Sequence, residues 1–173
     1  MIILYGESYT MFSQKKRSML TLHLRKLIIC VLITVAAGIL ISYFAAFRGS
    51  FYPEYIKPPL SLEQWAYLPV LTVFYLIVGI AAYAVSDSSS YLAKNALIKL
   101  FFSIILSIVW ALIFFCAGNA GTSFAVCAAC LAAVIYTSFT FYKIDPSAAF
   151  LLVPYIMWVC YLLVLNYRIW LLN

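Results

Sequence analysis

Aromatic and weakly polar side chains recur at helical spacing in this sequence, and they are the residues best suited to chemistry. Trp158, Leu162 and Asn166 stand four positions apart, which places them on one helix face. The other residues that share faces in this way are Thr72 and Tyr75 in one segment, and Ser103, Ser107 and Trp110 in the next. Together with Tyr155 and Trp65, they could line an apolar small-molecule pocket with a few polar groups. From composition alone, ordinary helix contacts and interfacial aromatics are the favoured interpretation.

The sequence lacks the groups that most enzymes and ion carriers need. Its one histidine, His23, lies among basic residues, and no acidic residue falls in the apolar segments described below. Proton relays, nucleophile–base pairs and metal sites depend on such groups, so we expect no catalytic residue, no metal and no cofactor. Cys127 and Cys130 form a C-x-x-C pattern, but their neighbours are small and apolar, and we interpret both as packing residues.

Five apolar segments must position these residues. They cover roughly residues 24–44, 66–85, 96–116, 122–141 and 148–170. Each segment is close to the ~20 residues that cross a ~30 Å hydrocarbon core. Charged residues make up only 9% of the chain, against about 25% in soluble domains. We therefore predict an all-α integral membrane protein, built as a bundle of five transmembrane helices.

The basic residues predict the orientation of that bundle. Eight of the eleven are expected on one side of the membrane: Lys15, Lys16, Arg17, Arg25, Lys26, Lys94, Lys99 and Lys143. The other three are Arg48, Lys57 and Arg168. The positive-inside rule then places the N-terminus in the cytoplasm. The net charge of +6 therefore reflects orientation and contact with anionic headgroups, not nucleic-acid binding.

The chain divides into a tail and one membrane domain. Residues 1–23 form a basic N-terminal tail, of which we expect residues 1–14 to be unstructured, and residues 24–173 form the transmembrane domain. The longest connection within the domain, residues 45–65, contains Pro58 and Pro59, which stiffen it. This loop is either an interfacial anchor or a lid over a site between the helices.

Three stretches of the chain carry a pattern that is found in a known family. The most specific stretch is Pro154-Tyr155-Ile156-Met157-Trp158-Val159, followed by Leu165-Asn166. The other two hold Phe51-Tyr52, Lys57-Pro58-Pro59-Leu60, Trp65, Pro69-Val70, Thr72, Tyr75 and Gly79, and then Phe101, Trp110 and Phe114-Phe115. From about residue 24 to the end, this pattern resembles the TspO/MBR family of tryptophan-rich sensory proteins and translocator proteins.

The resemblance implies a five-helix bundle, usually a homodimer, with a pocket that opens toward the loop between the first two helices. Members of the family bind porphyrins, cholesterol and benzodiazepine-type drugs. By position, the pocket would contain Pro58, Ser61, Leu71, Phe74, Tyr75, Ser107, Trp110, Trp158 and Leu162. Pro58 and Ser61 would belong to the loop lid, and Lys57 or Arg48 could meet the carboxylates of a porphyrin.

The chain departs from the family pattern within the pocket itself. Leu71 stands where the family usually has tryptophan, and Ser103 and Ser107 stand where it usually has glutamine and asparagine. Leu62-Glu63 replaces a usual Pro-Pro pair. These changes remove one indole and several hydrogen-bonding groups, so they weaken the case for tryptophan-dependent porphyrin chemistry.

We therefore expect a multi-pass membrane protein that binds a hydrophobic planar ligand and has a sensing or transport role. A porphyrin is the first candidate ligand, and a sterol or a benzodiazepine-type drug is the second. Two alternatives are a light-dependent porphyrin-degrading enzyme and a structural or regulatory membrane subunit without its own ligand. Expected partners are the small molecule, the lipid bilayer and a second copy of the chain. We favour a bacterial envelope membrane over the outer membrane of a mitochondrion.

Overall fold

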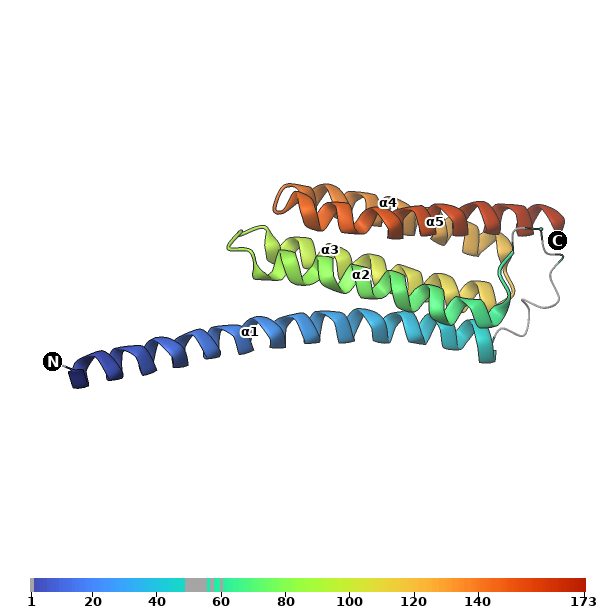
Figure 1. Ribbon diagram of the computed structural model, residues 1–173. Helices are drawn as coiled ribbons and strands as arrows, with labels where there is room; N and C mark the ends of the chain where they lie inside the picture. Colours follow the sequence, from blue (N-terminus) through green and yellow to red (C-terminus); the bar gives the residue numbers. More distant parts are fainter. Residues whose placement is uncertain (1, 49–55, 57, 60) are drawn as a thin grey trace.

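Five long helices build the molecule and lie roughly along one axis (Figure 1). The structure is a computed structural model that describes residues 2–48, 56, 58–59 and 61–173, without the side chains of residues 2–18, 47, 48 and 64. The helices are α1 (Ile2–Tyr43), α2 (Tyr67–Asp87), α3 (Ala93–Ala111), α4 (Ala120–Tyr142) and α5 (Pro146–Leu172). Helix α2 packs against both α1 and α5, and α4 packs against both α3 and α5. The described residues contain no strand.

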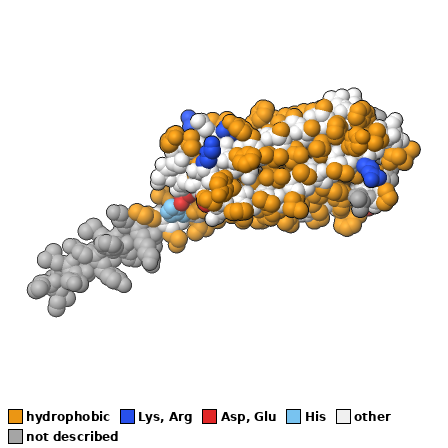
Figure 2. Space-filling model, turned by 90° about the horizontal axis from the view of Figure 1, so that it is seen from above, with side chains coloured by type: hydrophobic (Ala, Val, Ile, Leu, Met, Phe, Trp, Pro, Cys, Tyr) orange, Lys and Arg blue, Asp and Glu red, His pale blue; other side chains and the backbone are white. Residues whose placement is uncertain are grey.

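Each helix, taken with the π-helical turn that continues α1 (Phe44–Arg48) or α3 (Leu112–Cys116), contains an apolar stretch that is long enough to cross a membrane. The stretches are Met19–Ala46, Tyr67–Asp87, Ala93–Cys116, Ala120–Tyr142 and Pro146–Leu172. Large apolar side chains cover the outside of the bundle (Figure 2), which suits a lipid solvent in which helices satisfy their own backbone groups. The prediction of an all-α bundle with five transmembrane helices is confirmed. The expected segments from 66 to 170 agree with the observed stretches to within three residues at each end.

Helix α1 differs most from the sequence-based expectation. We expected residues 1–14 to be unstructured, but the helix runs without interruption from Ile2 to Tyr43. Once a helix is nucleated, each further residue adds a hydrogen bond at low cost, and no proline interrupts this stretch. The basic tail is therefore an extension of the first transmembrane helix, and it projects beyond the rest of the bundle (Figure 1).

The tightest helix contact joins α1 and α2, and two glycines make it possible. A Cβ atom added at Gly79 would stand 2.7 Å from the backbone Cα of Val31. A Cβ atom added at Gly38 would stand 2.9 Å from Cδ2 of Tyr75. Small residues of this kind let helices approach closely in membranes, where dispersion contacts rather than burial from water hold helices together. Gly79 therefore fixes the distance between α1 and α2.

Short turns and side-chain caps define where the later helices begin. Oδ1 of Asn119 accepts a hydrogen bond from the backbone N–H of Thr122 at 2.9 Å, which caps α4. The carboxylate of Asp145 accepts one from the N–H of Ser147 at 2.8 Å, which caps α5. Pro146 occupies the first position of α5, where its missing N–H costs no helix bond. These caps fix the first residues of α4 and α5, and the three-residue connection between Tyr142 and Pro146 makes the two helices an antiparallel pair.

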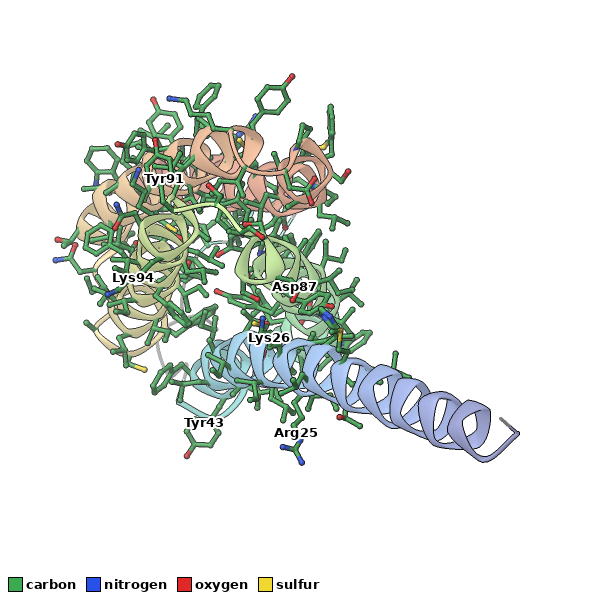
Figure 3. The ribbon with its side chains drawn as sticks, turned by 90° about the vertical axis from the view of Figure 1, so that its left-hand side faces the viewer. Arg25, Lys26, Tyr43, Asp87, Tyr91 and Lys94 are labelled. Carbon is green, nitrogen blue, oxygen red and sulfur yellow. The ribbon has the colours of Figure 1, made fainter. Side chains whose placement is uncertain are left out.

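Basic side chains gather at the end of the bundle from which α1 projects (Figure 2). At this end, Lys26 Nζ donates to Oδ1 of Asp87 at 3.2 Å, and Nδ1 of His23 lies 3.0 Å from the same oxygen. This cluster ties α1 to α2, and Figure 3 shows Lys26 and Asp87 pointing toward each other. Arg168 lies near the opposite end, late in α5. The asymmetry agrees with the sequence-based count, and the cytoplasmic location of this end stays a prediction.

Candidate functional site

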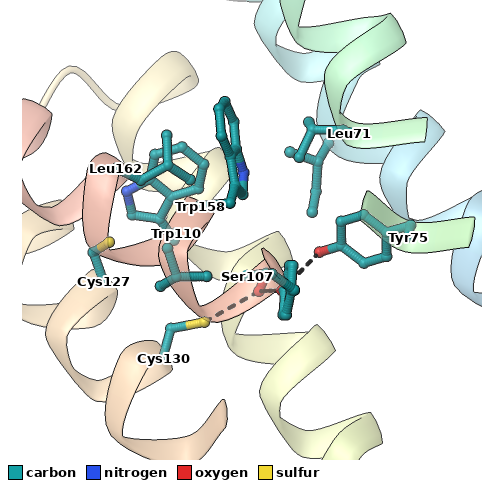
Figure 4. A pocket seen from close by; sticks show the side chains of 11 residues that line it. Leu71, Tyr75, Ser107, Trp110, Cys127, Cys130, Trp158 and Leu162 are labelled. Carbon is teal, nitrogen blue, oxygen red and sulfur yellow. Dashed lines mark hydrogen bonds between the residues drawn. The ribbon is translucent and has the colours of Figure 1, made fainter. Parts of the chain in front are cut away.

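A small buried cavity lies at the centre of the bundle, and side chains from all five helices line it (Figure 4). The lining consists of Ile41 from α1, Leu71 and Tyr75 from α2, Ser107 and Trp110 from α3, Cys127 and Cys130 from α4, and Tyr155, Trp158, Val159 and Leu162 from α5. Its volume is about 20 Å³, and a single water molecule needs roughly 10–15 Å³ on this measure. In this conformation the cavity therefore accommodates a group of about the size of water, and a larger ligand requires a wall to move.

A chain of hydrogen bonds crosses the polar side of the cavity and links four helices. The Ser107 hydroxyl donates to the carbonyl of Ser103 at 3.0 Å, so its oxygen is left to accept from its other neighbours. The Tyr155 hydroxyl lies 2.9 Å from Ser107 Oγ, and the Tyr75 hydroxyl lies 3.3 Å from that of Tyr155. Cys130 Sγ lies 3.1 Å from Ser107 Oγ. These polar groups therefore satisfy one another and offer no spare donor to a ligand.

Two donors at the cavity do remain unpaired. The indole N–H groups of Trp110 and Trp158 are buried and have no hydrogen-bond acceptor among the described residues. A buried donor without a partner costs about 1–3 kcal/mol, and most buried polar groups in proteins are paired. The cavity therefore contains two indole donors that an oxygen or nitrogen acceptor on a bound molecule could satisfy.

Trp158 separates the cavity from a much larger hollow on the outside of the bundle. This outer groove, between α2 and α5, has a volume of about 680 Å³. Its lining is apolar and consists of Leu62, Pro69, Val70, Val73, Phe74, Trp158 and Tyr161. The Trp158 ring stacks on Phe74 with centroids 5.2 Å apart and planes 25° apart. Trp158 is the one residue that lines both the cavity and the outer groove.

The opposite wall of the cavity is also aromatic. Trp110 stacks on Phe114, with centroids 5.5 Å apart and an angle of 15° between the planes. A turn of π-helix, Leu112–Cys116, ends α3 and carries both Phe114 and Phe115, which are fully buried. Such wide turns occur often at functional sites. Both indoles are therefore held by packed rings: Trp110 by Phe114 and Phe115, and Trp158 by Phe74, Tyr67 and Tyr161.

Most of the residues that the sequence predicted for the pocket come together here. Leu71, Tyr75, Ser107, Trp110, Trp158 and Leu162 all line the cavity. Phe74 does not reach the cavity but forms the inner wall of the outer groove. Trp65, considered as a third converging indole, is 74% exposed and contributes to neither hollow. The prediction that Trp65 converges with Trp110 and Trp158 is therefore wrong, because Trp65 lies before α2 on the surface of the bundle.

The loop residues of the predicted lid lie apart from the cavity. Pro58 is buried and lines a separate hollow of about 310 Å³, together with Pro59, Tyr161 and Arg168. The backbone N–H of Ser61 donates a hydrogen bond to the carbonyl of Pro58 at 2.9 Å. Ser61 itself lines none of these three hollows. Lys57 and the side chain of Arg48, proposed to meet ligand carboxylates, lie outside the described residues.

Sequence reasoning did not select several residues of the cavity wall. Ile41, Cys127, Cys130 and Val159 line it, although none was proposed for the pocket. Cys127 and Cys130 were interpreted as packing residues, and both are buried against neighbouring helices. The three-residue spacing that places Cys127 and Cys130 on one face of α4 is the signal that could have placed them at the cavity.

Removing Ser107 from the hydrogen-bond chain is expected to destabilise the bundle. Interhelical hydrogen bonds in membranes contribute about 0.6 kcal/mol on average and up to about 1.7 kcal/mol. We expect Ser107→Ala and Tyr155→Phe each to lower the free energy of unfolding by about 1 kcal/mol. The two losses should not add, because both substitutions break the same 2.9 Å bond. A double-mutant cycle in mixed micelles measures this coupling, and strictly additive losses would show that the bond contributes nothing.

Comparison with known proteins identifies the relationship. The family model for the TspO/MBR family matches residues 30–171, which is most of the chain. The chain belongs to the TspO/MBR family. The match begins within α1 and includes all the residues that line the cavity, from Ile41 to Leu162. The resemblance inferred from the sequence is therefore confirmed.

Individual relatives agree with the family assignment over long alignments. The chain is 28% identical over 153 residues to the tryptophan-rich protein TspO of Archaeoglobus fulgidus, covering 88% of this chain and 99% of that protein. It is 27% identical over 122 residues to the translocator protein of Ovis aries, covering 69% and 72% of the two chains. The translocator protein of Homo sapiens is 28% identical over 117 residues, covering 66% and 69%. A member of the TspO/MBR family with five membrane-spanning helices is an integral multi-pass membrane protein.

Proposed function

We propose that this protein binds a hydrophobic planar ligand of the porphyrin class between its helices, and that it serves in sensing or transport. The observation that carries the proposal is the pair of unpaired indole donors, Trp110 and Trp158, in the wall of one buried cavity. A flat ring with peripheral acceptors could stack on the indole faces and accept their N–H groups. Membership of the TspO/MBR family supports the same ligand class.

The energetics favour stacking and hydrogen bonding over simple burial. A ligand that enters from water gains roughly 25 cal/mol for each Å² of apolar surface that it buries. A ligand already dissolved in the bilayer gains little of this, because lipid tails are as apolar as the cavity wall. The remaining selectivity then comes from aromatic stacking, about 0.5–1.5 kcal/mol per pair, and from the two indole donors. The ligand class should therefore be aromatic and should carry acceptors.

We propose that the ligand enters sideways from the bilayer through the outer groove. The groove is apolar and opens between α2 and α5, and its volume of about 680 Å³ falls within the ~300–1,000 Å³ range of small-molecule sites. Trp158 would swing away from Phe74 as the ring moves inward, which would merge the groove with the cavity.

The proposal is tested by titrating protoporphyrin into the purified protein in nanodiscs, with protein-free nanodiscs of the same lipid as the control. We expect saturable binding with a dissociation constant in the micromolar range or below, followed by quenching of tryptophan fluorescence. A sterol and a benzodiazepine-type drug, added as competitors, would define the ligand range. Partitioning that never saturates and matches the empty nanodiscs would contradict the proposal and favour a structural subunit without a ligand.

One observation favours a second function, light-dependent breakdown of the porphyrin. Trp110, Trp158, Tyr75 and Tyr155 line the same cavity, and all four side chains can act as electron donors to an excited ring. Illumination of the porphyrin complex in air should then generate a product that does not form in the dark. Trp158→Phe should reduce its yield, and an equal yield with free porphyrin would exclude this function.

A homodimer, which we propose from the family resemblance, is tested by the mass of the protein in the same nanodiscs.

A further inference from the structure

A second groove lies on the outer surface of α3 and α4, away from the candidate site. The α3–α4 groove consists of Ile98, Lys99, Phe102, Ala132, Ala133 and Tyr136, and its volume is about 490 Å³. Five of these six side chains are hydrocarbon or aromatic, and the two alanines leave the space between the larger side chains open. None of the residues that line this groove lines the central cavity or the outer groove. The α3–α4 groove is therefore an independent feature of the bundle.

Lys99 gives this apolar groove a positive charge. It lies in the second turn of α3, inside a membrane-spanning stretch. Its ammonium nitrogen lies 4.1 Å from the centroid of the Tyr136 ring and donates to Oγ1 of Thr140 at 3.1 Å. These contacts hold the ammonium group against α4 and over the groove.

The ammonium group of Lys99 still has donors to offer. A lysine ammonium carries three N–H donors, and Thr140 is its one hydrogen-bond partner within the described part of the chain. No carboxylate from those residues lies within salt-bridge distance of Lys99, since the ion pairs found there are both made by Asp87. Lys94 and Lys143, at the same end of the bundle, add further positive charge (Figure 3 shows Lys94). The charge in the groove is therefore not neutralised by the protein.

We propose that the α3–α4 groove binds an anionic phospholipid. The phosphate would accept hydrogen bonds from Lys99, and one acyl chain would lie along the groove against Phe102 and Ala132. Basic pockets between transmembrane helices are known to select anionic headgroups, and charge-assisted hydrogen bonds to phosphate are among the stronger ones. The position of Lys99, less than two turns from the start of α3, suits the depth of a phosphate group at the membrane surface.

A lipid fits this groove better than a second copy of the chain. A two-fold contact through α3 and α4 would bring Lys99 and its symmetry mate into one interface. The groove contains no acidic side chain to neutralise these two charges. A phospholipid instead supplies both the negative charge and the hydrocarbon surface that the groove lacks.

The proposal is tested by native mass spectrometry of the protein with equal amounts of phosphatidylglycerol and phosphatidylcholine. Wild-type protein should retain phosphatidylglycerol in preference. Lys99→Gln should lower this retention about fivefold, as expected for the loss of one lysine near an anionic surface, and should leave phosphatidylcholine unchanged. Lys94→Gln is the matched control, because it removes a charge from the same end of α3 but outside the groove. Its effect on phosphatidylglycerol retention should be less than about half that of Lys99→Gln.

A third variant tests the groove without changing its charge. Ala132→Phe fills the floor of the groove from an exposed position, so it should reduce phosphatidylglycerol retention while an unaltered elution profile and circular dichroism spectrum show that the bundle is intact. Equal retention of the two lipids by the wild-type protein would overturn the proposal. So would equal effects of Lys99→Gln and Lys94→Gln. A dimer mass that Ala132→Phe abolishes, without lipid preference, would assign the groove to a second copy instead.

Discussion

Replacing Trp158 with alanine is expected to weaken protoporphyrin binding about tenfold or more, because it removes both a stacking surface and an unpaired donor. The stacking pair accounts for about 0.5–1.5 kcal/mol, and one hydrogen bond within the membrane for about 0.6–1.7 kcal/mol. Trp158→Phe keeps an aromatic face and loses the N–H, so its affinity should fall about threefold. The measurement is the saturation titration in nanodiscs, repeated for each variant.

Trp170 provides the matched control for this experiment. It lies on the same helix as Trp158, and it stacks on Phe124 with centroids 5.9 Å apart. It lines neither the central cavity nor the outer groove. Trp170→Ala should therefore leave porphyrin affinity within about twofold of wild type, because surface changes away from a site are usually worth under about 0.5 kcal/mol. Equal losses in Trp158→Ala and Trp170→Ala would contradict a site at Trp158.

The largest expected effect on stability is at Gly79. A leucine there would drive its Cβ atom against the backbone of Val31, which cannot rotate away as a side chain could. Overpacking typically costs about 1–3 kcal/mol and sometimes more, whereas the gain in helix propensity over glycine is about 1 kcal/mol. We expect Gly79→Leu to lower the free energy of unfolding by about 2 kcal/mol. The measurement is unfolding in mixed micelles as the fraction of sodium dodecyl sulfate is raised.

The control for Gly79→Leu places the same side chain where nothing opposes it. Ala125 is exposed on α4 and faces away from the core, so Ala125→Leu should change the free energy of unfolding by less than about 0.5 kcal/mol. Gly79→Ala should fall between the two, because it adds the clashing Cβ atom without the rest of the leucine. A Gly79→Leu variant as stable as wild type would mean that α1 and α2 are not packed as described.

The fold was largely predictable because apolar length is a strong signal. A segment such as residues 66–85 must form a helix in lipid, where no other regular structure satisfies an isolated backbone. The prediction of an unstructured N-terminal tail was wrong. Residues 1–14 precede the first apolar segment and were expected to be unstructured, whereas continuity with a stable helix extends α1 to Ile2.

The site was only partly predictable, since helical spacing shows which residues share a face but not where that face points. Ser107 and Trp110 were grouped correctly, and both reach the cavity. Trp65 was grouped with them by residue type alone and lies on the surface. Cys130 was dismissed as a packing residue, although it takes part in the hydrogen-bond chain. Lys99 was counted only as an orientation signal, because its depth within α3 next to Tyr136 depends on how two helices pack.

The most direct test of the account is to record the indole N–H signals of ¹⁵N-tryptophan-labelled protein by NMR, with and without protoporphyrin. The chain contains four tryptophans, so four signals are expected, and single Trp→Phe variants assign them. We predict that the Trp110 and Trp158 signals shift as the porphyrin saturates, through its ring current and the new hydrogen bonds, while Trp65 and Trp170 stay nearly unchanged. Saturable binding that shifts Trp65 or Trp170 and leaves Trp110 and Trp158 unmoved would contradict a ligand site between the helices.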